Sequence, residues 1–115
     1  MKKLNIAIIG LGNIGNYLYK YLNNNKKILS KKNNCIPNIV NVSAKNKNKK
    51  RDIKIKKRLW LNNYIEATKN PKIDLIVELI GGAEGPTKKL VFNALKNKKQ
   101  LTKLKIYTGD KHPHD

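Results

Sequence analysis

Three glycines near the amino terminus stand at a spacing that suits phosphate binding. Gly10, Gly12 and Gly15 give the pattern G-x-G-x-x-G directly after an apolar run. The first glycine allows a tight exit from a strand, the second lets the backbone approach a pyrophosphate, and the third lets a helix lie close to the strand. Amides at the start of that helix donate to the phosphates, helped by the helix dipole. We predict a pyrophosphate-binding turn made of Gly10, Leu11, Gly12, Asn13, Ile14 and Gly15.

A second candidate group is the basic run that follows the apolar segment from Ile36 to Ala44. Lys45 to Arg51 contains no acid, and the first carboxylate comes at Asp52. In a doubly wound sheet this position reaches the adenosine ribose of a dinucleotide, where a carboxylate favours NAD and basic groups favour the 2′-phosphate of NADP. We predict NADP, with NAD as the alternative. A solvated loop is the competing interpretation of these lysines, because lysine is abundant throughout the chain.

The elements that must position these groups follow from the apolar pattern. The runs 6–9 and 74–80 are almost continuously apolar, which is typical of parallel strands buried on both faces. Between and after them we expect a helix from the glycine turn to about Ser30, a strand at 36–44, a short strand at 59–61, and helices at 62–69 and 86–98. This order predicts an α/β fold, a Rossmann-like doubly wound parallel sheet in three layers.

The second strong strand ends in glycine, as the first does. In an open parallel sheet, ligands bind beyond the carboxyl ends of the strands where the strand order reverses. We therefore expect Ile80, Gly81 and Gly82 to face the same crevice as the glycine turn.

The composition limits the functions to consider. The chain of 115 residues is of single-domain size and carries 26 Lys and Arg against 7 Asp and Glu, a formal net charge of +19 that would suit nucleic acid. Nucleic-acid modules use arginine to contact bases and aromatic rings to stack on them. Here Arg51 and Arg58 are the only arginines, beside one Trp and one Phe. We expect a small-molecule cofactor as ligand and no nucleic-acid partner.

Neither a metal site nor a membrane partner is expected. Cys35, the single cysteine, has no His or second Cys at ligand spacing, and His112 and His114 lack a third ligand. One unpaired cysteine agrees with a reducing cytoplasm. No apolar run approaches the roughly twenty residues of a bilayer span, and the apolar start has no small-residue cleavage site. We expect a cytoplasmic protein.

The segments IAIIGLGNIG and DLIVELIGGAEGP, at this separation, resemble the N-terminal NAD(P)-binding domain of homoserine dehydrogenase. The likeness runs from about Lys3 to Lys99. It implies a family of enzymes that interconvert aspartate semialdehyde and homoserine by hydride transfer, in threonine, methionine and isoleucine biosynthesis, and whose full-length members are homo-oligomers. It also implies that Lys45 contacts the 2′-phosphate. Glu78 lies within the family motif VELIGG, with no role assigned.

After Lys99 the resemblance ends, because the family continues with a strand of the type K-H-V-V-T-A-N-K-A that this sequence lacks. We therefore expect an NAD(P)-binding domain at 1–99 and a divergent tail at 100–115, without the family's substrate domain and its catalytic residues. We expect a truncated or frame-shifted chain that has no activity of its own and leaves one sheet edge exposed. A free-standing dinucleotide-binding module or sensor is the alternative, and a nucleic-acid-binding protein ranks below it.

Overall fold

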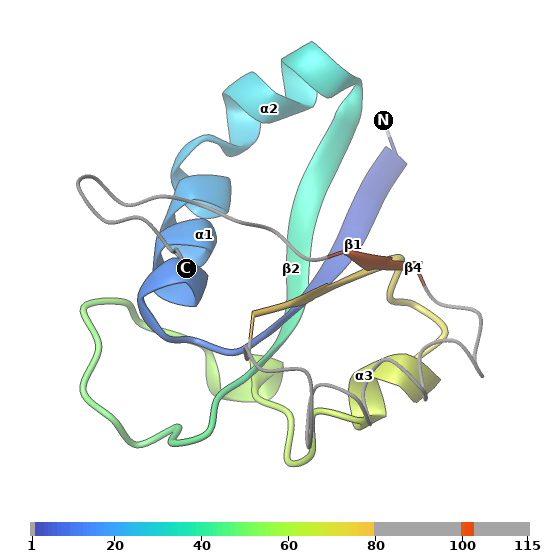
Figure 1. Cartoon of the computed structure of the whole chain (residues 1–115). Helices are drawn as coiled ribbons and strands as arrows, with labels where there is room; N and C mark the ends of the chain where they lie inside the picture. The colour runs from blue at the N-terminus through green and yellow to red at the C-terminus, as the bar shows by residue number, and fades with distance from the viewer. Residues whose placement is uncertain (1, 80–99, 103–115) are drawn as a thin grey trace.

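The computed structural model describes residues 2–79 and 100–102 (Figure 1). In this part of the chain the elements are β1 (Lys2–Ile9), α1 (Asn13–Asn24), α2 (Lys26–Asn33), β2 (Cys35–Ser43), the 3-10 helix η1 (Lys57–Leu59), α3 (Glu66–Lys69), β3 (Leu75–Glu78) and β4 (Gln100–Thr102). The strands form one parallel sheet in the order β2-β1-β3-β4. The chain thus winds from β1 to β2 on one side and returns past β1 to β3 on the other. This is the predicted doubly wound arrangement.

Both faces of the sheet are buried. Ile6 and Ile8 belong to a core cluster that α1 covers, whereas Ala7 and Ile9 belong to a second cluster that includes Ala67 of α3. In Figure 1, α1 and α2 lie to the left of the strands and α3 lies to the right. Successive residues of a strand point to opposite faces, so a strand covered on both faces needs apolar residues at every position. The three-layer prediction is confirmed.

The single helix expected after the glycine turn is two helices, separated at Asn25. Asn25 has φ −113° and ψ 19°, outside helical values. Its backbone N–H and its side-chain amide both donate to the carbonyl of Tyr21, at 3.0 and 2.9 Å. Asparagine side chains compete in this way with the regular helical bonds. α2 then runs three residues beyond the expected end, until Asn34 adopts a left-handed conformation with φ 52°.

The second strand agrees with the prediction to within one residue. Pro37 lies inside β2 opposite Leu4, and β2 is an edge strand of the described sheet, where proline is tolerated. The register shifts by one residue between Ile6 and Ala7, which leaves Val40 without a partner on β1. Such a bulge increases the local twist of the strand.

The segment between β2 and β3 is less regular than the sequence predicts. The short strand expected at 59–61 is the 3-10 helix η1 and a single bridge between Val42 and Trp60. The helix expected from residue 62 begins only at Glu66. The side-chain oxygen of Asn63 accepts from the backbone N–H of Ile65 at 2.9 Å, a local turn that competes with helix formation.

β3 is shorter than the expected strand at 74–80, and it pairs with β1 along its whole length. The helix expected at 86–98 lies outside the described residues, as do Ile80, Gly81 and Gly82. The next strand, expected to be missing or scrambled, is not missing, because β4 pairs in parallel with β3. A ladder needs only main-chain donors and acceptors, so β4 can form without the family's sequence. The division of the chain after residue 99 remains a prediction.

Candidate functional site

The glycine turn lies at the carboxyl edge of the sheet, where the strand order reverses. Gly10 follows β1 directly with φ 103°, in the region that favours glycine. Its N–H donates to the carbonyl of Ser43, the last residue of β2, at 2.8 Å. On the other side, the N–H of Leu79 donates to the carbonyl of Ile9 at 2.8 Å. The turn is therefore fixed between the ends of β2 and β3.

The other two glycines differ in what surrounds them. A Cβ atom on Gly15 would collide with the carbonyl oxygen of Gly10, so the absence of a side chain lets α1 lie against the end of β1. At Gly12 an added Cβ would meet no atom of the described residues within 4 Å, its chain neighbours aside. Gly12 thus borders open space, where a ligand could approach the backbone. The close approach at Gly15 and the left-handed backbone of Gly10 are those expected of this turn, and the pyrophosphate contact of Gly12 remains a prediction.

α1 begins immediately after Gly12, which has extended backbone angles. The first helical bond joins the N–H of Asn16 to the carbonyl of Gly12 at 2.9 Å. The first turn holds no acidic residue, and no side chain caps it within the described part of the chain. The leading amides of a helix lack intrahelical acceptors, and the helix dipole makes this end positive. An anion bound here could accept hydrogen bonds from these amides and also interact favourably with the positive end of the dipole.

A pocket of about 610 Å³ opens beside the turn. It brings together the residues on which the sequence prediction rested most, because Lys45 lines it beside Gly10 and Gly12, which stand more than thirty positions earlier in the chain. The residues lining it are Gly10, Leu11, Gly12, Ala44, Lys45, Asn46, Lys49, Arg51 and Leu79. Asn13 and Ile14 lie at the start of α1 outside this lining, and Gly15 is buried behind it.

The sequence prediction named only Lys45 from the basic loop. Lys49 and Arg51 also line the pocket. The sequence indicated them only as members of a basic run that contains no acidic residue. The sequence could not tell which members of that run face the cavity. Leu79 also lines the pocket. It directly precedes in the chain the residues Ile80, Gly81 and Gly82, which were predicted to face the same crevice and lie outside the described residues.

Two contacts tie the chain beyond the basic loop to α1. The ammonium of Lys20 donates to the carboxylate of Asp52, and the hydroxyl of Tyr19 donates to the carbonyl of Lys54 at 3.4 Å. The hydrogen bond from Lys20 is the largest cause that lowers the pKa of Asp52. The helix that presents the glycine turn therefore also anchors the far end of the loop.

Glu78 is buried at the end of β3, opposite Ile9 in the sheet register. The described lining of the pocket does not include it. Glu78 directly precedes Leu79, which does line the pocket.

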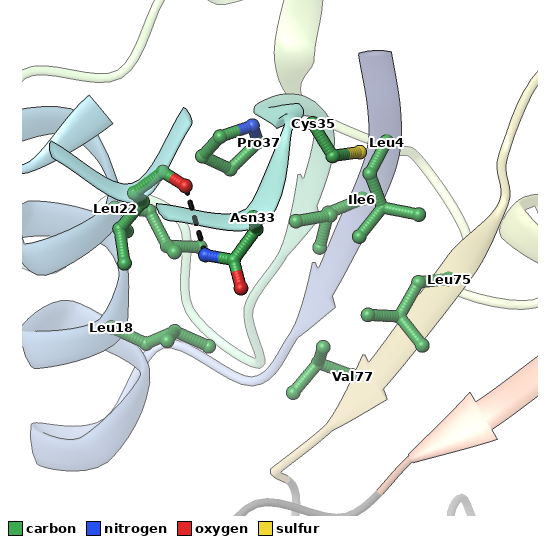
Figure 2. Close-up of a pocket in the computed structure, with 10 residues that line it drawn as sticks. Leu4, Ile6, Leu18, Leu22, Asn33, Cys35, Pro37, Leu75 and Val77 are labelled. Carbon is green, nitrogen blue, oxygen red and sulfur yellow. Dashed lines mark hydrogen bonds between the residues drawn. The ribbon is translucent and has the colours of Figure 1, made fainter. Parts of the chain in front are cut away.

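A second pocket, of about 250 Å³, is almost wholly apolar (Figure 2). It lies on the α1 side of the sheet, and Figure 2 shows side chains from the helices facing Ile6, Leu75 and Val77 of the strands. Cys35 stands at its rim, at the start of β2. This lining offers little polar chemistry.

Residues 2–79 and 100–102 hold no group of three or more potential metal ligands. No helix in the same part of the chain is long and apolar enough to cross a membrane. His112 and His114 lie outside the described residues.

Comparison with known proteins finds homoserine dehydrogenases similar to this chain. Homoserine dehydrogenase of Bacillus subtilis (strain 168) is 29% identical over 101 residues, which are 88% of this chain and 23% of that protein. The homoserine dehydrogenase of Methylobacillus glycogenes is 28% identical, over 88% of this chain and 24% of its own length. No family model matches the sequence. The chain spans about a quarter of the length of these relatives.

Solved structures give the same result. A crystal structure of S. aureus homoserine dehydrogenase matches 90% of this chain with a TM-score of 0.78 and 35% identity, over 26% of its own length. The enzyme from Thiobacillus denitrificans matches with a TM-score of 0.78 and 27% identity, over 90% of this chain and 23% of its own. An NAD-binding protein from Listeria innocua, 18% identical with a TM-score of 0.62, shares the fold. The predicted resemblance is confirmed.

Proposed function

We propose that this chain, a homologue of the homoserine dehydrogenases, is the NAD(P)-binding portion of such an enzyme. The observation that carries the proposal is the shared pocket, in which the glycine turn and the basic loop after β2 line one cavity at the carboxyl edge of the sheet. Dinucleotides bind at this place in doubly wound folds.

The pyrophosphate fits the glycine turn. The open space beside Gly12 allows close approach of a phosphate to the backbone, and the leading amides of α1 supply donors. No acidic side chain is among the described residues that line the pocket. The pyrophosphate, which carries two negative charges, would therefore meet backbone donors without a repelling carboxylate among the described lining residues.

NADP is the proposed cofactor in preference to NAD. Lys45, Lys49 and Arg51 bring three positive charges to one pocket. Charge-assisted hydrogen bonds from the ammonium groups of Lys45 and Lys49 to a 2′-phosphate would be about twice as strong as bonds between neutral groups, and the guanidinium of Arg51 adds positive charge beside them. The 2′-hydroxyl of NAD would find no carboxylate acceptor among the described lining residues.

The nicotinamide ring supplies or accepts the hydride when the cofactor is bound. The residues of this chain hold the phosphates and the adenosine ribose, and so orient the ring toward a substrate. We propose aspartate semialdehyde and homoserine as that substrate pair, with groups from the remaining three quarters of the enzyme completing the site. The biosynthetic pathway of threonine, methionine and isoleucine, a cytoplasmic location and a homo-oligomeric enzyme belong to the same proposal.

Titration of the chain with NADPH, NADH and a DNA oligomer at two salt concentrations tests the proposal. We expect NADPH to bind most tightly and to keep measurable affinity at the higher salt concentration. DNA binding through phosphates alone would fall steeply with salt. Binding of DNA but of neither dinucleotide would overturn the proposed function.

A further inference from the structure

The basic loop closes around the side chain of its last residue. The guanidinium of Arg51 donates from Nη2 to the carbonyl of Asn46 at 2.7 Å, and from Nη1 to the carbonyls of Lys47 and Lys49 at 3.3 and 3.1 Å. A turn reinforces this shape, since the N–H of Lys49 donates to the carbonyl of Asn46 at 3.2 Å. One planar side chain thus fixes three carbonyl groups of the loop.

The same guanidinium is held against an aromatic ring. The Cζ atom of Arg51 lies 5.7 Å from the ring centroid of Trp60, within the range of a cation–π interaction. Trp60 in turn forms a bridge with Val42 of β2, and the N–H of Leu61 donates to the carbonyl of Val42 at 3.0 Å. Arg51 therefore connects the loop to the end of the sheet.

The two lysines in the pocket differ from Arg51 in their contacts. Within the part of the chain that the structure describes, the ammonium groups of Lys45 and Lys49 have no hydrogen-bonding or ion-pair partner. Three of the donors of Arg51 are already bound to loop carbonyls. The ammonium groups of the lysines are thus available to a ligand. Arg51 has three of its N–H donors bound to its own loop, and its buried Nε has no partner among the described residues.

From these contacts we propose that Arg51 is the positioning residue of the 2′-phosphate site. It holds residues 45–50 in the shape in which Lys45 and Lys49 line the pocket, and it engages carbonyl oxygens that would otherwise be free to face a phosphate. A loop ordered before binding loses less conformational entropy when the ligand arrives. This inference rests on the proposed function, because it deepens the same site.

The planar fork of arginine, not its charge alone, carries this role. Lysine keeps the charge but offers a compact ammonium in place of a fork with several donors. If Arg51 acted as one more positive charge near the phosphate, Arg51→Lys would bind like the parent. If it positions the loop, Arg51→Lys loses affinity although the net charge is unchanged.

The test is calorimetric titration of the 115-residue chain with adenosine 2′,5′-bisphosphate and with AMP, which differ only in the 2′-phosphate. We expect Arg51→Ala and Arg51→Lys each to lose about tenfold in affinity for the bisphosphate, equivalent to about 1.4 kcal/mol, and to change little toward AMP. Arg58→Ala is the matched control. Arg58 is exposed and lies outside the described pocket lining. Its substitution removes the same charge as Arg51→Ala, so this variant should bind like the parent.

Hydrogen exchange of the amides at 46–50 gives a readout that does not depend on ligand. We expect Lys49, whose N–H is bonded to Asn46, to exchange faster in Arg51→Lys than in the parent, while the amides of β1 keep their protection. Unchanged exchange together with parent-like bisphosphate binding in Arg51→Lys would overturn the positioning role. If Arg51→Ala unfolds, the lysine variant alone decides between these outcomes.

The outcomes separate this inference from the proposal on which it rests. Equal affinity of the parent for the bisphosphate and for AMP would overturn the NADP preference, and the role of Arg51 with it. A parent preference for the bisphosphate that persists in both Arg51 variants would overturn only the role of Arg51.

Discussion

A Cβ atom on Gly15 would run into the carbonyl oxygen of Gly10, so the first turn of α1 lies directly against the backbone that follows β1. This contact fixes the angle at which the helix leaves the sheet. Because Gly10 is held by its hydrogen bond to Ser43, it cannot move aside without breaking the junction of β1 and β2.

We therefore expect Gly15→Ala to lower the free energy of unfolding by about 1–3 kcal/mol or more, as overpacking does in a well-packed core. Urea unfolding followed by circular dichroism measures the change. Gly12→Ala serves as control, because in the described part of the chain its added Cβ meets no atom within 4 Å beyond its chain neighbours, and its backbone is extended. Equal urea midpoints for Gly15→Ala and the parent would show that the helix can shift freely.

Gly12→Val should abolish dinucleotide binding without unfolding the domain. The added methyl groups would occupy the open space that we assign to the pyrophosphate. Circular dichroism reports on the fold, and fluorescence titration with NADPH reports on binding. A folded variant that binds NADPH as well as the parent would show that the pyrophosphate does not lie at this turn.

NADPH should bind on the order of ten- to a hundredfold more tightly than NADH at low salt, because charge-assisted contacts to the 2′-phosphate contribute about 1–3 kcal/mol. Lys45→Asp should erase or reverse this preference, since it places a carboxylate in the pocket. Lys27→Asp changes the net charge equally at an exposed position in the first turn of α2, and should leave the preference nearly intact. A parent that binds both cofactors equally would contradict the prediction.

The ion pair between Lys20 and Asp52 should make a part of the stability depend on pH. The pKa of Asp52 is lowered from its ordinary value of 3.8, so its contribution is present above 3.8 and is lost as the pH falls through the lower value in the folded chain. The effect is small, because both side chains are partly exposed.

Comparing urea midpoints of the parent and Asp52→Asn at pH 6 and near pH 3 tests this dependence. We expect the parent to be the more stable at pH 6, and the difference to shrink as the carboxyl of Asp52 becomes protonated. In a chain that carries Lys20→Met, Asp52→Asn should no longer change the urea midpoint in a pH-dependent way, because the partner of Asp52 is gone. A difference that grows on acidification would have the opposite sign and would exclude the ion pair as its source.

The parts of the fold that could be predicted are those fixed by local backbone chemistry. The glycine spacing and the apolar run before it specify a strand, a turn and a close helix, and the structure has all three, with Gly10 at positive φ and Gly15 against the carbonyl of Gly10. The break at Asn25 was missed because it depends on a side chain competing for the carbonyl of Tyr21, which an apolar pattern does not register.

The site was predicted less completely than the fold. Lys45 was predicted from its charge, and it lines the pocket. The hydrogen bonds that fold the loop around Arg51 depend on carbonyl positions, and its ring contact depends on a tryptophan nine residues further along the chain. β4 was missed for a related reason, since parallel pairing with β3 uses main-chain groups that leave no signal in residue type.

The last prediction is that the 115-residue chain binds NADPH but does not oxidise homoserine. Hydride transfer requires the nicotinamide and the reacting carbon to be held at near-attack distance, and a group that accepts or donates the proton of the hydroxyl. The described pocket is lined by backbone, apolar and basic groups suited to phosphates and a ribose, and the chain spans about a quarter of its relatives. Absorbance of the reduced cofactor, followed with homoserine and NADP, measures turnover. The S. aureus enzyme is the positive control, and the same chain carrying Gly12→Val is the negative one. Turnover by the parent chain at a rate comparable to the full-length enzyme, and its loss in Gly12→Val, would place the catalytic groups within these residues and contradict the assignment of this chain to cofactor binding alone.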